Sequence, residues 1–115
     1  KRLKDEVETL QDLPEGREFD IIVNATPLGS GENEGLSPLT TDFMSSAHIV
    51  IDCVPSLEKT KILIQADETN VKTISGAKLA FFKAYAADCL FAGVDINDEQ
   101  ALRLYGEYIE TEATV

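Results

Sequence analysis

The sequence is poor in positive charge. Only 10 Lys and Arg stand against 21 Asp and Glu in 115 residues, which gives a formal net charge of −11. A field of that sign repels nucleic-acid phosphates and anionic lipid headgroups, so nucleic acid and membrane surfaces are disfavoured as partners. No apolar run approaches the roughly 20 residues that a membrane span requires, and no apolar signal-peptide core follows the charged residues 1–6. We therefore expect a cytoplasmic protein.

Histidine and cysteine are almost absent. His48 is the only histidine, and Cys53 and Cys89 are the only cysteines. A small secreted scaffold would carry more cysteines and place them in loops, whereas both lie in apolar segments, which predicts reduced, buried thiols. With one imidazole, no cluster has the spacing of a metal site, and no Ser-His-Asp arrangement follows from spacing. The sequence predicts no metal.

The length and the apolar pattern favour one α/β domain over residues 1–115. Three short apolar runs read as strands, at Ile21–Val23, His48–Val54 and Val71–Ile74. The first two are continuous and β-branched, as in parallel strands that are covered on both faces. A long glycine- and proline-containing loop covers 25–38. Residues 1–19 are a lead-in, in which residues 1–13 fit a helix or a short fourth strand equally well.

Helix signals lie between and after these strands. Thr60 is expected to cap a helix that ends at Asn70, and a short helical turn is expected at Thr41–Ser45. A helix of roughly sixteen residues begins at Gly76 and ends at Gly93, and its many apolar and alanine positions predict cover on several sides. Asn97 caps the last helix, with Gln100 completing a capping-box-like pair. The buried stripe of this helix is expected at Ala101, Leu102, Tyr105, Tyr108 and Ile109, with a frayed tail after Glu110.

Three parallel strands joined by helices predict a partial Rossmann-like, doubly wound sheet, with strand and helix units in 20–75 and two C-terminal helices in 76–110. Ligands bind such sheets beyond the carboxyl ends of the strands, here at Asn24–Gly29 and Cys53–Ser56. Asn24 and Thr26 offer hydrogen-bonding side chains there. Pro27 fixes φ and Gly29 tolerates a positive φ. The same residues also fit a tight loop without a ligand.

The segment Asp20–Gly29, with its Asn-Ala-Thr-Pro-Leu-Gly, closely resembles the D-hydrophobic-N-A-T-P-x-G stretch of the shikimate dehydrogenase family. Val50–Val54, followed by Leu57, Thr60 and Leu63, is similar to the family's D-x-V-Y-x-P-x-x-T-x-L-L segment. Thr73–Gly76 with Leu79 resembles its G-x-x-M-L-x-x-Q helix start. The resemblance runs from about Asp20 to Tyr108. It implies an NADP-dependent oxidoreductase of the shikimate pathway, which reversibly reduces 3-dehydroshikimate to shikimate.

By this resemblance the chain corresponds to the C-terminal half of an NADP-binding domain. The residues that the resemblance places near the ribose and pyrophosphate of NADP are Asn24, Ala25, Thr26, Pro27 and Leu28. The residues that it places beside the nicotinamide are Cys53, Val54, Gly76 and Leu79. The sequence does not distinguish NADP from NAD as the cofactor.

Several family features are missing. No G-x-G-x-x-G phosphate loop occurs in the chain, nor the family's contact to the 2′-phosphate, and the substrate domain with its catalytic Lys/Asp pair is absent. We therefore expect no catalytic residue in this chain and no activity from it alone. A strand at Ile21–Val23 without its usual neighbour predicts self-association, or pairing with a missing N-terminal half.

The matched part departs from the family at several positions, of which Pro55 and Lys83 fall on the substrate side more than on the cofactor side. Pro55 stands where the family has Tyr, Lys83 where it has a substrate-contacting Gln, and Leu79 where it has Met. Lys83 is either a solvated surface lysine or a cation that faces an acid substrate. Shikimate, quinate and other small polyol acids all remain open as substrates.

A non-catalytic α/β module that binds a partner or an effector is the alternative function. Asp52 near a strand end is reminiscent of an acidic receiver pocket. That pocket needs a second acidic residue at another strand end, and Asp20 begins its strand instead.

Overall fold

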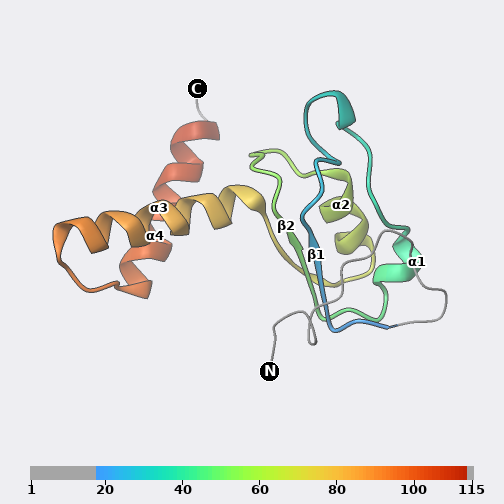
Figure 1. The fold of residues 1–115 in the computed structure, drawn as a ribbon, viewed down its shortest axis with the longest axis horizontal. Coiled ribbons are helices and arrows are strands. Elements are labelled where there is room, and N and C mark those ends of the chain that lie inside the picture. The colour runs from blue at the N-terminus through green and yellow to red at the C-terminus, as the bar shows by residue number, and fades with distance from the viewer. Residues whose placement is uncertain (1–17, 114–115) are drawn as a thin grey trace.

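A computed structural model of the protein describes residues 18–113 (Figure 1). Three strands form one parallel sheet in the order β1-β2-β3: β1 (Ile21–Asn24), β2 (Ile49–Asp52) and β3 (Lys72–Ile74). The helical segments are η2 (Gly31–Asn33), α1 (Thr41–Met44), α2 (Lys61–Glu68), α3 (Gly76–Ala92) and α4 (Asp98–Ala113). The predicted α/β class with a parallel sheet is confirmed. The lead-in and the possible fourth strand lie outside the described residues.

The hydrophobic core lies between one face of the sheet and the helices α1 and α2. Its buried members are Met44, Ala47, Val50, Ile62, Leu63, Ala66 and Val71, with Ile22 and Leu39 packed against them. Fully burying each large side chain of this kind stabilises the fold by about 1.5–3 kcal/mol. Because side chains alternate across a strand, Ile22 of β1 and Val50 of β2 point into this core together.

The opposite face of β1 is open among the described residues. Ile21 is 57% exposed and Val23 is 53% exposed. The expectation that this strand is covered on both faces is therefore wrong for this chain, because α1 and α2 pack on one face only and α3 and α4 project away from the sheet (Figure 1). β1 is also the edge strand of the described sheet, as the sequence predicts.

Helix α3 departs from its expected environment. Only Gly76 and Cys89 are buried in it, and Phe91 is 89% exposed. Helix α4 packs along one side of α3 through an aromatic cluster of Phe81, Phe82, Tyr105 and Tyr108. The prediction that α3 is covered on several sides is thus wrong, since α4 supplies a single neighbour.

The predicted helix ends are mostly confirmed. Asn70 and Gly93 adopt left-handed φ angles of 58° and 68° where α2 and α3 end. The side chain of Asn97 accepts a hydrogen bond from the Gln100 amide at 2.9 Å, as expected of the α4 cap. Helix α4 continues to Ala113, so the prediction of a frayed tail after Glu110 is wrong for residues 111–113, and residues 114–115 lie outside the described part. Of the expected α4 stripe, Ala101 is buried, but Leu102 remains 55% exposed.

The Tyr85 hydroxyl joins α3 to the start of α4. It accepts a hydrogen bond from the Asn97 amide and lies within hydrogen-bonding distance of Gln100 Oε1. The backbone hydrogen bond at Asn97 lowers the pKa of Tyr85, but desolvation and the neighbouring Cys89 and Asp98 outweigh it, so the pKa is raised above 10.0. The phenol therefore stays protonated and able to donate at neutral pH.

Both cysteines are free thiols, as predicted, but only one is buried. Cys89 lies in the α3–α4 contact, whereas Cys53 is exposed because it follows the last residue of β2. The prediction of a buried Cys53 is wrong. Within residues 18–113, no helix is long and apolar enough to cross a membrane.

Gly76 fixes where α3 leaves the sheet. A Cβ on this residue would lie 2.0 Å from the carbonyl oxygen of Val54 and 2.9 Å from the nitrogen of Pro55. Neither backbone atom can move aside without displacing the end of β2. Only glycine therefore allows the first turn of α3 to pack against the β2–α2 loop.

We predict that Gly76→Ala destabilises the chain by about 3 kcal/mol, because the added methyl group overlaps backbone rather than a flexible side chain. Gly106→Ala in α4 is the matched control. It meets nothing within 4 Å and should stabilise the chain by about 0.8 kcal/mol through helix propensity. Chemical denaturation of both variants measures the difference. Equal stabilities would show that the Val54 contact does not constrain α3.

Candidate functional site

The candidate site is the edge where the three parallel strands end. The loops after β1 and β2 and the start of α3 meet there, because parallel strands carry their carboxyl ends to the same side. Asn24 and Asp52 are the last residues of β1 and β2, and they are partners in the strand register. Both side chains fall on the core face of the sheet, two residues beyond Ile22 and Val50.

The Asn24 side chain is fully committed to hydrogen bonds within the protein. Its Nδ2 donates to Asp52 Oδ1 at 3.0 Å and to the Leu28 carbonyl at 3.1 Å. Its Oδ1 accepts from the Thr26 amide at 3.1 Å and from the Thr26 hydroxyl at 2.6 Å. These four bonds use both donors and both lone pairs of the amide. Asn24 is 2% exposed and has no capacity left for a ligand.

Thr26 continues the same network along the loop. Its hydroxyl donates to Asn24 and accepts from the Leu28 amide at 3.2 Å. One lone pair of the hydroxyl remains, so Thr26 can accept one more hydrogen bond but has no proton left to donate. Gly29 closes the loop with a φ of 105°, as the sequence predicts for this position.

Asp52 joins these loops to α2. Its side chain is fully buried, and Oδ1 accepts from Asn24 and from the Val54 amide at 3.1 Å. Its Oδ2 accepts a hydrogen bond from the Thr60 hydroxyl. Thr60 stands at the predicted start of α2, but its side chain makes no capping bond to the helix. The sequence suggested Asp52 only as part of an acidic receiver-like pocket, and Thr60 only as a helix cap and a motif residue. The hydrogen bond between them was not predicted, although the period-two offset of Asp52 from Val50 and the start of α2 at Thr60 place both residues at this edge.

The residues predicted to border a cofactor present mainly backbone and apolar surface. Ala25, Thr26 and Pro27 are exposed and Leu28 is half-buried. On the second loop Cys53 is exposed, whereas Val54 is buried against Gly76. These residues do come together at one edge. Their assignment to NADP stays a prediction.

Leu79, Lys83 and Pro55 lie at the margin of this edge. All three are exposed. At about 100° per residue, Leu79 and Lys83 lie on the same side of α3 as Gly76. Lys83 forms no ion pair with any residue in the described part of the chain.

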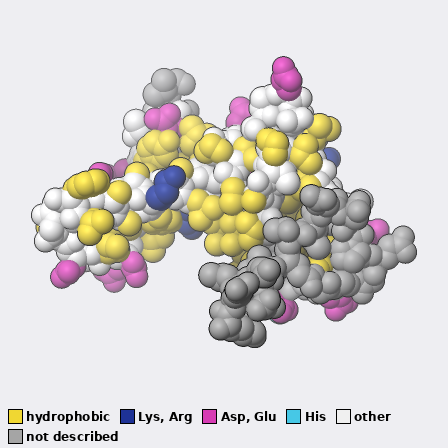
Figure 2. Space-filling model, in the orientation of Figure 1, with side chains coloured by type: hydrophobic (Ala, Val, Ile, Leu, Met, Phe, Trp, Pro, Cys, Tyr) yellow, Lys and Arg dark blue, Asp and Glu magenta, His cyan; other side chains and the backbone are white. Residues whose placement is uncertain are grey.

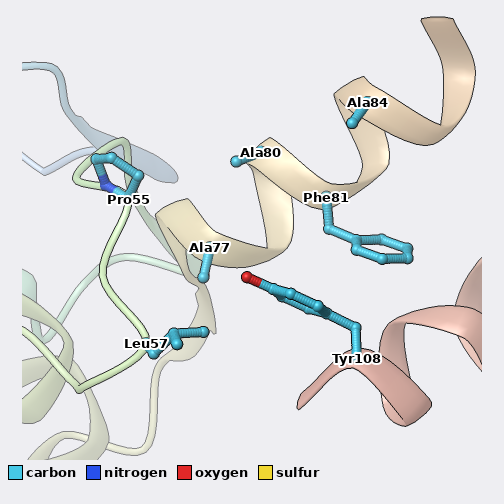
Figure 3. Close-up of a pocket in the computed structure, with 7 residues that line it drawn as sticks. All are labelled: Pro55, Leu57, Ala77, Ala80, Phe81, Ala84 and Tyr108. Atoms are coloured by element: carbon cyan, nitrogen blue, oxygen red, sulfur yellow. The ribbon is translucent and has the colours of Figure 1, made fainter. Parts of the chain in front are cut away.

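An apolar groove between α3, α4 and the β2–α2 loop was not predicted (Figure 3). The groove has a volume of about 400 Å³. It is lined by Pro55, Leu57, Ala77, Ala80, Phe81, Ala84 and Tyr108, and we call it the α3–α4 groove. The Tyr108 hydroxyl points toward Ala77 within it. The sequence signal is the alanine spacing 77, 80 and 84, which leaves a shallow strip along one helix face.

No acidic residue occurs among the residues that directly follow β1 and β2. Residues 25–31 and 53–57 contain no Asp or Glu, and neither does the run from Thr69 to Ala87, which holds three lysines. On the face shown in Figure 2, apolar side chains cover the middle of the molecule and acidic ones lie toward its outer parts. An anionic ligand therefore meets no exposed carboxylate from these segments, despite the acidity of the whole chain.

The described residues contain no group of three or more His, Cys, Asp or Glu side chains that could hold a metal ion. With the buried Asp52 already bonded to three donors, the residues that directly follow β1 and β2, 25–31 and 53–57, offer no carboxylate for a cation. Its chemistry suits recognition of a ligand by shape and by backbone groups.

Comparison with known proteins identifies relatives of one kind. Shikimate dehydrogenase (NADP(+)) of Alkaliphilus metalliredigens is 35% identical over 89 residues, which is 76% of this chain and 31% of that protein. Its counterpart in Methanocaldococcus jannaschii is 31% identical over 81 residues, covering 70% of this chain and 29% of that protein. The chain is homologous to part of a shikimate dehydrogenase. It spans about a third of the length of these curated relatives.

Solved structures agree with this homology. Shikimate dehydrogenase 1 of Peptoclostridium difficile superposes with a TM-score of 0.68 and 26% identity, over 84% of this chain and 36% of that one. A shikimate dehydrogenase in complex with NADP+ superposes with a TM-score of 0.60 and 28% identity, over 78% of this chain and 32% of that one. The resemblance stated from the sequence motifs is thereby confirmed. No protein-family model matches the chain.

We predict that Asn24→Ala destabilises the chain by about 3 kcal/mol, because the buried Asp52 and the Thr26 and Leu28 groups lose their partner together. Asn33→Ala is the matched control, since the Asn33 side chain forms no hydrogen bond within residues 18–113 and lies outside the network. It should change stability by less than about 0.5 kcal/mol. Urea denaturation compares the two, and similar losses would contradict a special role for the Asn24 amide.

Proposed function

We propose that this chain is part of an NADP-dependent shikimate dehydrogenase-type oxidoreductase, which interconverts 3-dehydroshikimate and shikimate. The observation that carries the proposal is the interlocked Asn24–Leu28 loop at the carboxyl edge of the sheet, in a chain homologous to proteins named for this activity. The residues that directly follow β1 and β2, 25–31 and 53–57, carry no carboxylate to oppose the phosphates of a dinucleotide. In this proposal the chain, residues 1–115, is the C-terminal part of a cytoplasmic NADP-binding domain.

The residues of this chain hold and orient the cofactor. Ala25, Thr26, Pro27 and Leu28 lie against the ribose and pyrophosphate through backbone and apolar contacts, while Asn24 keeps that loop in shape. Cys53, Val54, Gly76 and Leu79 border the nicotinamide end. The cofactor would supply the redox chemistry: NADPH would donate a hydride to 3-dehydroshikimate, and NADP+ would accept one from shikimate. Excluding water and fixing the ring are what these apolar groups contribute.

The proton transfer and most substrate contacts are assigned to residues outside this chain. Within it, Lys83 and Pro55 are proposed to reach the substrate. Lys83 is exposed, has no carboxylate partner within residues 18–113 and lies on the Gly76 side of α3. An ammonium group donates only and carries a charge, so it favours an acid substrate. A polyol acid of the shikimate or quinate class fits these properties.

The open β1 edge supports association with a further segment. Ile21 and Val23 are exposed, and one side of β1 has no partner strand among residues 18–113. Both features favour pairing with a missing N-terminal half or self-association of the isolated chain. Sedimentation of the isolated chain should therefore show species larger than a monomer at micromolar concentration.

We predict that the full-length gene product oxidises shikimate with NADP+ and that the isolated 115-residue chain does not. The assay follows NADPH absorbance with shikimate and with quinate, each tested with NADP+ and with NAD+. Turnover of neither acid with either cofactor would refute the proposed function. Turnover of quinate alone would keep the reaction class and change the substrate.

We predict that Lys83→Gln raises the KM for the acid substrate by roughly 5- to 100-fold, the equivalent of losing about 1–3 kcal/mol from a charged hydrogen bond. The KM for NADP should stay nearly constant. Lys72→Gln, at the amino-terminal end of β3, is the matched control and should change neither constant. Unchanged KM values in both variants would show that Lys83 is a surface lysine that does not contact the substrate.

A further inference from the structure

Asp52 is a fully buried acidic side chain with no cationic partner among residues 18–113. The ion pairs in the described part of the chain join His48 to Asp20 and Lys59 to Asp67, and neither involves Asp52. Burying such a group is unfavourable unless hydrogen bonds compensate it. Three neutral donors do so here, from Asn24, Val54 and Thr60.

These donors come from three separate segments. Asn24 ends β1 and lies 28 residues away in the chain, Val54 belongs to the β2–α2 loop, and Thr60 begins α2. Thr60 directs its hydroxyl to Asp52 and leaves its own helix uncapped. A threonine at that position ordinarily caps the helix, so the bond to Asp52 replaces a local interaction with a long-range one.

Two of the residues that donate hydrogen bonds to the Asp52 carboxylate connect it to the two loops of the site. On one side Asn24 connects the carboxylate to the Thr26 amide and the Leu28 carbonyl. On the other side the Val54 amide is fixed, and the Val54 carbonyl is the atom against which Gly76 packs. Both loops of the candidate site and the first turn of α3 thus take their positions from a single side chain.

We propose that Asp52 is the positioning residue of the cofactor edge: through Asn24 and Val54 it sets the relative placement of the two loops that receive the dinucleotide. The expected effect on NADP affinity rests on the proposed function, but the positioning of the two loops by Asp52 does not. Asp52 touches neither cofactor nor substrate in this account, because it is fully buried beneath the loops.

The isosteric amide separates positioning from charge. In Asp52→Asn, the side-chain oxygen takes the place of Oδ1 and accepts from Asn24 and Val54. The new NH₂ group donates to Thr60, whose hydroxyl turns from donor to acceptor. All three hydrogen bonds are remade without the charge. A role in positioning the loops is therefore retained in Asp52→Asn, whereas a role in proton transfer is lost.

The experiment measures amide hydrogen exchange at Thr26, Leu28 and Val54 in the full-length gene product, with NADP affinity by titration calorimetry. In Asp52→Ala we expect exchange to rise about tenfold or more at all three amides, and NADP affinity to fall about tenfold or more. In Asp52→Asn both quantities should stay within about threefold of the parent protein. If Asp52 acted through its charge, Asp52→Asn would not restore the exchange rates and the NADP affinity.

Thr60→Val provides a second variant in case Asp52→Ala fails to fold. It removes only the bond to Oδ2, so we expect a partial rise in exchange at Val54 and Thr26. Thr69→Val, at the other end of α2, is the matched control because its hydroxyl bonds only to carbonyls of its own helix. It should leave all three amides unchanged.

Two results would overturn the proposal. One is faster exchange at Val54 alone in Asp52→Ala, which would show that the Asn24 loop keeps its shape unaided. The other is a loss in Asp52→Asn as large as in Asp52→Ala. Absence of NADP binding by the parent protein would refute the proposed function instead, while the exchange pattern would still decide whether Asp52 positions the loops.

Discussion

The buried carboxylate of Asp52 is the constraint on which the candidate site depends. It lies at the polar end of the core, in the same column of side chains as Val50, and accepts hydrogen bonds from β1, from its own loop and from α2. Because the group is removed from water, each donor must stay in place for the fold to tolerate it. The shape of the surface loops is therefore linked to the packing of the core beneath them.

A second constraint acts where α3 begins. The contact between Gly76 and the Val54 carbonyl directs α3 away from the sheet, and the aromatic contacts with α4 then hold the two helices as a pair. Little else joins this helical pair to the sheet, and much of its apolar surface, including Leu90 and Phe91, remains open. This exposure agrees with a chain that corresponds to about a third of its relatives' length.

Most of the fold could be predicted from the sequence because the residue patterns for strands and for helix ends were mutually consistent. β-Branched runs marked the strands, and Asn70, Gly93 and Asn97 marked helix ends with residues whose conformational preferences are strong. Burial was predicted less well. Hydrophobicity indicates which residues favour burial. Whether Val23 or Phe91 is actually buried depends on which other elements pack against it in three dimensions, and the local residue pattern does not show this. Cys53 was misjudged for a related reason, since the strand ends one residue before it.

At the site, the motif correctly brought Asn24, Thr26 and Gly29 together, but their side-chain chemistry required the three-dimensional arrangement. Asn24 looks like a ligand-binding amide in the sequence, and only the four bonds it makes show that it is already saturated. The role of Thr60 was hidden for the opposite reason. Its local signal as a helix cap is strong, and a tertiary bond to Asp52 overrides it.

The most direct test of the account is a crystal structure of the full-length gene product with NADP bound. The account predicts that the cofactor contacts the backbone of Ala25–Leu28 and of Cys53–Val54, while the Asn24–Asp52 hydrogen bond stays intact beneath it. A structure in which the Asn24 amide leaves Asp52 to bind the cofactor would contradict the account. So would a cofactor seated in the α3–α4 groove.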